Sequence, residues 1–275
     1  MSAAIAPRGI IQRVGWAVHD GIVLTRRNLL RYIRIPTLLV FSTVQPVMFV
    51  FLFRYVFGSA ITELPPGAQT YVNFLIPGIF VQTAIFGATQ TGVGLAEDLN
   101  AGIIDRFRSL PTARSAVLAG RTTADLFRNL FVVLLMTAVG YLVGFRFQEG
   151  AVPAALAIGL AILVGFAFSW ISAAIGLAIK NVESVQAASF VWIFPLTFAS
   201  SAFVPIEGMP PWLQAFARNN PVTIWANTLR GFTLGPKYLA FIHETQLGLV
   251  VKSGLWIAAI LAVFVPLSIR IYRRT

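Results

Sequence analysis

Six long stretches of mostly apolar residues limit this chain to one kind of fold. They cover residues 37–53, 72–96, 129–145, 151–179, 184–204 and 247–271. A helix needs roughly 20 apolar residues to cross a bilayer, with about 17 as the lower limit, and inside lipid it satisfies every backbone group. Only 11% of all residues are charged, too few to cover a soluble protein of this size. The sequence predicts an all-α polytopic membrane protein with six spans, with residues 1–36 as a cytoplasmic tail and residues 37–275 as a single transmembrane domain.

The distribution of basic residues predicts the orientation of the spans. If the N-terminus is inside, the cytoplasmic segments contain fifteen of the 21 Lys and Arg residues, including Arg114, Arg121 and Arg128. This asymmetry follows the positive-inside rule, and an even number of spans returns the C-terminus to the cytoplasm. We therefore expect a multi-pass protein of the cell membrane. The net charge of +11 does not indicate nucleic-acid binding, because the basic residues lie between apolar spans.

Residues 9–34 have the pattern of an amphipathic helix. Arg13, Arg27, Arg31 and Arg34 fall on one face, and apolar residues fall on the other. Such a helix can lie in the headgroup layer of the membrane with its apolar side toward the lipid. Whether it also contacts a cytoplasmic partner remains open at this point. No signal peptide is expected, because no compact apolar core precedes a small-residue cleavage site.

Several kinds of chemistry are absent from the sequence. It contains no Gly-x-x-x-x-Gly-Lys-Ser/Thr phosphate loop, no cysteine, and two histidines without recognisable partners. We therefore expect no catalytic site, metal or cofactor in this chain. No carboxylate lies near the middle of a predicted span, which weighs against coupling to an ion gradient. Buried polarity should be limited to serines, threonines and glutamines, and Gln45, Gln82 and Gln90 are candidates for a substrate path.

Small residues recur at every fourth position in the second and fourth spans. They are Ala84, Ala88, Gly92 and Ala96, then Ala157, Ala161, Gly165, Ser169 and Ala173. Such stripes let helices approach closely in lipid, either inside the bundle or between subunits.

The segment between the fifth and sixth spans contains helix-starting prolines. They predict one short helix beginning near Pro211 and a second after Asn220-Pro221 that extends to about Leu234. We expect this pair to dip into the outer leaflet with Trp212, Phe216 and Trp225 at headgroup level. A structured surface loop is the alternative.

The cytoplasmic segment after the second span contains an amphipathic stretch. Ile103, Ile104, Phe107 and Leu110 fall on one helical stripe, and Pro111 ends the helix. The stripe could insert into a groove of a partner protein, or it could lie on lipid.

The order of motifs along the chain resembles one transporter family. The first group comprises Glu97, Gly102, Asp105-Arg106-Phe107-Arg108, Leu110-Pro111, Arg114 and Gly120-Arg121. The second comprises Met209-Pro210-Pro211-Trp212-Leu213, Asn220-Pro221 and Leu229-Arg230-Gly231. Together they resemble permeases of ATP-binding cassette (ABC) transporters of the type-2 export class, and most closely the daunorubicin-resistance permease group.

The resemblance implies a permease that exports a hydrophobic or amphipathic substrate such as a drug, lipid or glycolipid. ATP and Mg would be bound by a partner ABC ATPase subunit, and a second permease chain, identical or related, would complete the pathway in the lipid membrane. The pathway would lie between the two chains, lined by the first, second and fifth spans. The implied ATPase-coupling residues are Glu97, Gly102, Ile103, Asp105, Arg106, Phe107, Arg108, Leu110, Pro111 and Arg114. A polysaccharide or cell-wall glycan exporter and a non-transporting scaffold are the alternatives.

Overall fold

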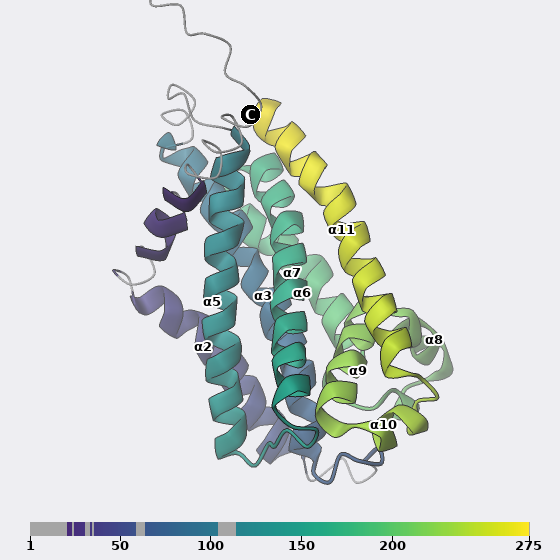
Figure 1. Cartoon of the computed structure of the whole chain (residues 1–275). Helices are drawn as coiled ribbons and strands as arrows, with labels where there is room; N and C mark the ends of the chain where they lie inside the picture. Colours follow the sequence, from purple (N-terminus) through teal and green to yellow (C-terminus); the bar gives the residue numbers. More distant parts are fainter. Residues whose placement is uncertain are drawn as a thin grey trace, which may run out of the picture.

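A computed structural model describes residues 21–23, 25–30, 34, 36–58, 64–103 and 114–274. Every regular element in these ranges is helical, as the sequence predicts. Long helices run side by side between two ends of the molecule (Figure 1). The upper end in Figure 1 contains the last turns of α3 and α11 and the first turns of α5, and the lower end contains α8, α9 and α10.

The long helices lie close to the predicted spans. They are α2 (Pro36–Phe51), which continues into the π-helix η1 (Leu52–Phe57), α3 (Tyr71–Asn100), α5 (Arg114–Leu142), α6 (Ala151–Ile179), α7 (Val182–Phe198) and α11 (Gln246–Arg274). Within the described residues, four helices are long and apolar enough to cross a membrane: Tyr71–Asn100, Leu118–Leu142, Ala151–Ile179 and Gln246–Arg274. The stretches Ser42–Phe57 and Val182–Phe198 are shorter apolar helices.

The α3 helix forms the centre of the bundle, because its side chains are buried along nearly its whole length. Both small-residue stripes are buried where α3 packs along α6. A Cβ atom at Gly92 would overlap the carbonyl oxygen of Ser172, and one at Gly176 would overlap that of Gly92. The stripes therefore serve packing inside the chain rather than contact between subunits.

The short helices of the lower end begin at the predicted prolines. They are η2 (Ile206–Gly208), α8 (Pro211–Asn219), α9 (Pro221–Leu234) and α10 (Pro236–Phe241). Asn220 caps α9, because its side chain accepts a hydrogen bond from the backbone N–H of Val222. Trp212 and Phe216 are exposed, but Trp225 is fully buried, so its predicted headgroup position is wrong. The cause is packing: α9 lies against α3, α6 and α11 and turns Trp225 toward Phe168.

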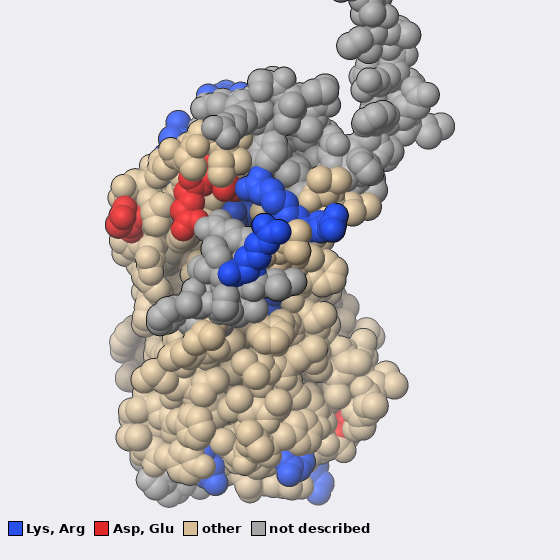
Figure 2. Space-filling model, turned by 90° about the vertical axis from the view of Figure 1, so that its left-hand side faces the viewer, with Lys and Arg blue, Asp and Glu red and all other residues tan. Residues whose placement is uncertain are grey.

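Charged residues gather at the two ends of the molecule. Figure 2 shows acidic and basic side chains together near the upper end, a few basic ones at the lower end, and an uncharged band between them. This is the distribution expected of a protein whose middle faces hydrocarbon.

Candidate functional site

A cavity of about 290 Å³ lies in the upper half of the bundle, between α2, α3, α5 and α7. Eleven of its lining residues are polar: Asn28, Ser42, Gln45, Gln82, Thr83, Thr89, Gln90, Glu97, Arg121, Arg128 and Gln186. Phe86, Phe190, Pro46 and Val93 supply the apolar part of the wall. A polar cavity inside an apolar helix bundle is costly unless something uses its hydrogen bonds, so it is the strongest candidate site.

All three glutamines predicted for a substrate path line this one cavity. Gln45 comes from α2, and Gln82 and Gln90 lie two turns apart on α3. Gln82 is buried, and its Oε1 atom has no hydrogen-bond partner within the part of the chain that the structure describes. The same holds for Oγ1 of the adjacent Thr83. Both oxygens are fully buried, so a bound molecule would reach them only after a rotation of the side chain.

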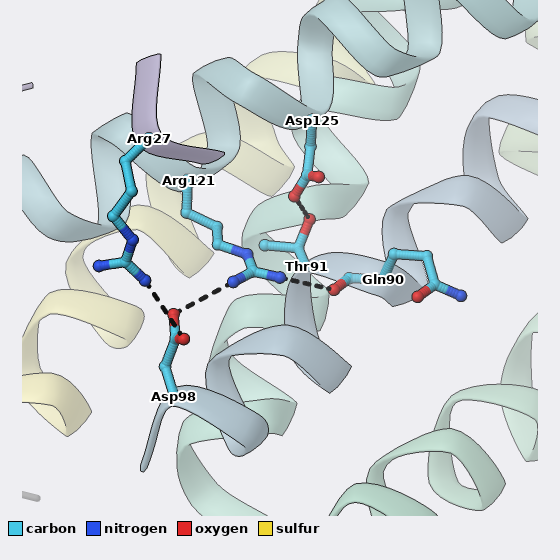
Figure 3. A network of polar contacts seen from close by, with 6 residues as sticks. All are labelled: Arg27, Gln90, Thr91, Asp98, Arg121 and Asp125. Atoms are coloured by element: carbon cyan, nitrogen blue, oxygen red, sulfur yellow. Dashed lines mark hydrogen bonds and ion pairs between the residues drawn. The ribbon is translucent and has the colours of Figure 1, made fainter. Parts of the chain in front are cut away.

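An ion-pair network centred on Asp98 includes Arg121, which lines the cavity (Figure 3). The carboxylate of Asp98 accepts hydrogen bonds from Arg121 Nη1 at 3.2 Å and from Arg27 Nη2 at 3.4 Å. Arg121 Nη2 also donates to the carbonyl oxygen of Gln90 at 3.5 Å. Residues 25–30, which are helical, are thereby joined to both α3 and α5. This contact supports the prediction that Arg27 lies on the polar face of an N-terminal helix.

A second buried ion pair, between Arg128 and Asp125, lies about two turns further along α5 than Arg121. Arg128 Nε is 3.7 Å from Asp125 Oδ1, and both side chains are almost completely buried. Thr91 Oγ1 donates a hydrogen bond to Asp125 Oδ2. Arg128 Nη2 donates to the carbonyl oxygen of Gly87 at 2.5 Å. The pair is thus held against α3 from two sides.

Two glycines on α3 make room for the two arginines of α5. A Cβ atom at Gly94 would overlap the guanidinium of Arg121, and one at Gly87 would lie 3.1 Å from Nη2 of Arg128. Both the glycines and the arginines are seven residues apart, which matches an antiparallel pairing of the two helices. A Cβ atom at either position would have to displace the end of an α5 side chain, Arg121 at Gly94 and Asn129 with Arg128 at Gly87.

The predicted start of the third span at about residue 129 is wrong, because the long apolar helix of the structure includes Arg121 and Arg128. The third long helix begins at Arg114 rather than near residue 129, so both arginines and Asp125 lie inside α5. The expectation that buried polarity is limited to uncharged groups is wrong for the same reason. The signal that could have revealed it is the spacing of Arg121, Asp125 and Arg128, which puts all three on one helical face.

The remaining predicted site residues fall into two groups. Glu97 lines the cavity, Gly102 adopts a positive φ of 65° directly after α3, Ile103 follows it, Arg114 begins α5, and Arg34 is exposed. The others lie outside the described residues: Arg13, Arg31, Asp105, Arg106, Phe107, Arg108, Leu110 and Pro111.

The lower end holds a separate polar cluster around Arg230 of α9. This fully buried side chain donates to the carbonyl oxygens of Phe74 (2.9 Å), Ser201 (2.6 Å) and Ala202 (3.1 Å). It also donates to Ser201 Oγ (3.0 Å) and Asn227 Oδ1 (3.1 Å), so all five of its N–H groups are used. Burial raises the pKa of the neighbouring Tyr238, and the charge of Arg230 opposes that rise.

Comparison with known proteins gives one family. The profile of the ABC-2 type transporter family matches residues 21–234. A daunorubicin resistance ABC transporter permease protein, DrrB1, from Streptomyces coeruleorubidus is 35% identical over 90% of this chain and 83% of its own length. A probable doxorubicin resistance ABC transporter permease protein, DrrC, from Mycobacterium tuberculosis is 28% identical over 94% of this chain and 89% of its own length. A putative transport permease, ycf38, from Porphyra purpurea is 27% identical over 76% and 75% respectively.

Proposed function

This chain belongs to the ABC-2 type transporter family, and from that premise we propose that it is the membrane subunit of an exporter for a hydrophobic or amphipathic molecule. The export is driven by ATP hydrolysis on a separate ATPase chain. Relatives whose names state daunorubicin or doxorubicin resistance favour a drug-like substrate. The cavity between α2, α3, α5 and α7 is the single observation that carries the proposal, since it offers a binding site inside the helix bundle.

The energy source of this proposal lies outside the chain. The sequence lacks a phosphate loop, so ATP would be bound by the partner. Asp125 is a buried carboxylate of the kind that ion-driven transporters use, but here it pairs with Arg128 and Thr91. Asp125 therefore supports a structural role rather than ion coupling.

The connection between α3 and α5 is the proposed contact with the ATPase. Both helices that flank it line the cavity, and the Asp98 network joins them to the N-terminal helix. A displacement at this connection would therefore shift Arg121 and Gln90, which face the cavity. Such a mechanism requires the ATPase to bind two arrangements of the helices with different affinity.

The proposed topology has six spans with both termini in the cytoplasm. A second permease chain, identical or related, would complete the pathway beside α2, α3 and α7. The long apolar helices and the charged ends are consistent with this arrangement.

Transport into inverted membrane vesicles tests the function directly. The chain is co-expressed with a candidate ABC ATPase subunit, and ATP-dependent uptake of daunorubicin is measured by fluorescence. Uptake should disappear when the catalytic carboxylate of the ATPase is replaced, and it should persist when a proton ionophore is added. Uptake that survives the inactive ATPase but collapses with the ionophore would contradict the proposal.

Co-purification tests the coupling segment. Changing Arg106→Glu and Arg108→Glu together should abolish recovery of the ATPase with the tagged permease, because two charges on the proposed docking surface are reversed. The matched control is Arg273→Glu with Arg274→Glu, an exposed pair at the end of α11. Equal recovery of the ATPase from both variants would show that the coupling surface lies elsewhere.

A further inference from the structure

The α11 helix leaves most of its surface uncovered by the rest of the chain. It runs along the edge of the bundle between the lower and the upper end (Figure 1), and only 11% of its most apolar 18 residues are buried. Its inner side packs on α6 and α9, and near its upper end Tyr272 is buried in an apolar cluster with Leu118 and Leu177. The opposite side therefore contacts whatever surrounds the protein.

A stripe of exposed residues follows this outer side over most of the helix. At about 100° per residue, its members fall within a sector of about 60°. They are Lys252, Trp256, Val263, Leu267, Arg270 and Arg274, and all six are exposed. The stripe is basic at both ends and apolar between them.

The length of the stripe matches the thickness of a bilayer. Lys252 and Arg270 are 18 residues apart, which corresponds to about 27 Å along the helix axis. The hydrocarbon core of a membrane is roughly 30 Å thick, so both side chains can extend into a headgroup layer while the apolar residues face lipid chains.

The two basic ends of the stripe differ in how their charge is balanced. Lys252, at the lower end, forms an ion pair with Glu244. At the upper end Arg270, Arg273 and Arg274 are all exposed, and within the part of the chain that the structure describes no carboxylate pairs with any of them. Three positive charges within five residues are thus available where the apolar part of the stripe ends.

The helix macrodipole accounts for only part of this arrangement. It favours basic side chains in the last turn of any helix, whatever lies around that turn. It does not explain why the exposed apolar residues Val263 and Leu267 lie directly before the arginines on the same stripe. An anionic phospholipid matches both parts, because its phosphate attracts the arginines and its chains cover the apolar residues. An acidic partner in water would match the arginines alone.

We propose that the upper end of α11 is a binding site for anionic phospholipid. The phosphate contacts Arg270, Arg273 and Arg274, and an acyl chain lies along Val263 and Leu267. The lipid belongs to the leaflet at the upper end, which is the cytoplasmic leaflet in the proposed topology. This inference goes beyond the proposed export function and depends neither on the substrate nor on the ATPase.

Fluorescence quenching by labelled lipids tests the site. The native chain contains no cysteine, so Leu267→Cys can carry a single fluorophore. The full-length variant is reconstituted in phosphatidylcholine vesicles that contain nitroxide-labelled phosphatidylglycerol or, at the same fraction, nitroxide-labelled phosphatidylcholine. Phosphatidylglycerol should associate at least about five-fold more strongly, since one basic residue at an anionic surface contributes roughly that factor. Equal quenching by the two lipids would overturn the proposal.

A second reporter on the same helix provides the matched control. Leu255 is exposed and lies three residues from Lys252, as Leu267 lies three residues from Arg270. Because Lys252 is already paired with Glu244, a fluorophore at Leu255→Cys should be quenched by the two lipids to within about two-fold. An equal preference at both positions would show that the whole protein attracts the lipid, and the site would be wrong.

Substitution of the arginines identifies the source of the preference. Arg270→Gln, Arg273→Gln and Arg274→Gln together should abolish it, and lysine at the same positions should retain most of it because the charge is kept. About 1 M salt should weaken it, since the charges are exposed. Arg218→Gln with Lys237→Gln, two exposed residues at the lower end, should leave it unchanged. A preference that survives the three glutamines would overturn the proposal.

A soluble headgroup separates a lipid site from a phosphate site. Glycerophosphoglycerol carries the phosphate of phosphatidylglycerol without its chains. It should not displace the labelled lipid at equal concentration, because it cannot cover Val263 and Leu267. Displacement would show that the arginines bind phosphate alone and that the apolar half of the site is wrong. ATP-driven uptake of daunorubicin is measured separately, so either failure would leave the export function standing.

Discussion

At the scale of single residues, Asp98 joins three helical segments through one carboxylate. It accepts from Arg121, whose side chain is 9% exposed, and from Arg27, whose side chain is 40% exposed. The pair with Arg121 matters more, because an exposed pair contributes only about 0–1 kcal/mol. Removing Asp98 leaves Arg121 buried against Gly94 without its counter-charge.

We expect Asp98→Ala to destabilise the protein by about 3–5 kcal/mol, the typical effect of removing one partner from a buried pair. The measurement is the midpoint of unfolding in a denaturing detergent titration. Glu244→Ala is the control, because Glu244 pairs with Lys252 at an exposed position and should change stability by less than about 1 kcal/mol. A similar loss in both variants would mean that Asp98 has no special role in joining the helices.

Arg230 leads to a prediction of another kind, since it depends on hydrogen-bond geometry rather than on charge pairing. All five of its N–H groups are bonded to oxygens of α3, α9 and the turn after α7. Lysine keeps the charge but has three donors and no planar fork. Arg230→Lys should therefore lower stability by about 2–4 kcal/mol, because at least two buried carbonyls lose their partner. Arg218→Lys, on the exposed face of α8, should have no measurable effect in the same titration.

The sequence could predict which residues are polar but not how they pair. Gln45, Gln82 and Gln90 were recognised because uncharged polar residues inside apolar stretches are conspicuous, and the structure brings all three to one cavity. Arg121 and Arg128 were missed because their charges move the apparent start of the apolar stretch to residue 129. Their burial depends on Gly87 and Gly94 of another helix, and the register of two helices is not visible in either one alone.

At the scale of whole helices, the sequence predicts the ends of a helix correctly where an apolar stretch is flanked directly by residues that cap helices. The fourth stretch was predicted as residues 151–179, and α6 has the same bounds, with Gly150 before it and a left-handed Lys180 after it. The third span was predicted to begin near residue 129, whereas α5 begins at Arg114, because the buried Arg121, Asp125 and Arg128 make this part of the helix too charged to be recognised as a span. Composition therefore identifies a helix well only where lipid or an apolar core surrounds it.

Packing between α3 and α6 gives a prediction at this scale. A Cβ atom at Gly176 would overlap the carbonyl oxygen of Gly92, so Gly176→Ala must separate the two helices. We expect a loss of about 1–3 kcal/mol in the detergent titration, the usual cost of overpacking. Gly159→Ala lies in the same helix with open space around it and should be neutral or stabilising by up to about 1 kcal/mol. Equal effects of the two substitutions would indicate that helix propensity, not close approach, determines the result.

At the scale of the whole molecule, the number of spans depends on the two shorter apolar helices. The α7 helix has 17 residues and is about 26 Å long at 1.5 Å per residue, slightly less than the roughly 30 Å of a hydrocarbon core. Its surroundings are those of a crossing helix, since it packs on α3 and α6 and has exposed apolar residues such as Val191 and Phe194. Tight packing and local thinning of the bilayer can accommodate a mismatch of this size.

Cysteine labelling decides whether α7 crosses the membrane, because the native chain contains no cysteine. Asn100 ends α3, Gly208 follows α7, and α5, α6 and α7 lie between them. Three crossings place these two positions on opposite sides, and two crossings place them on the same side. We expect Gly208→Cys to react with a membrane-impermeant maleimide in intact cells, and Asn100→Cys to react only in inverted vesicles. Both positions are exposed, so the chain itself does not shield them from the reagent. Reaction of both variants in intact cells would show that α7 does not cross the membrane. The number of spans would then be odd, and the two termini would lie on opposite sides.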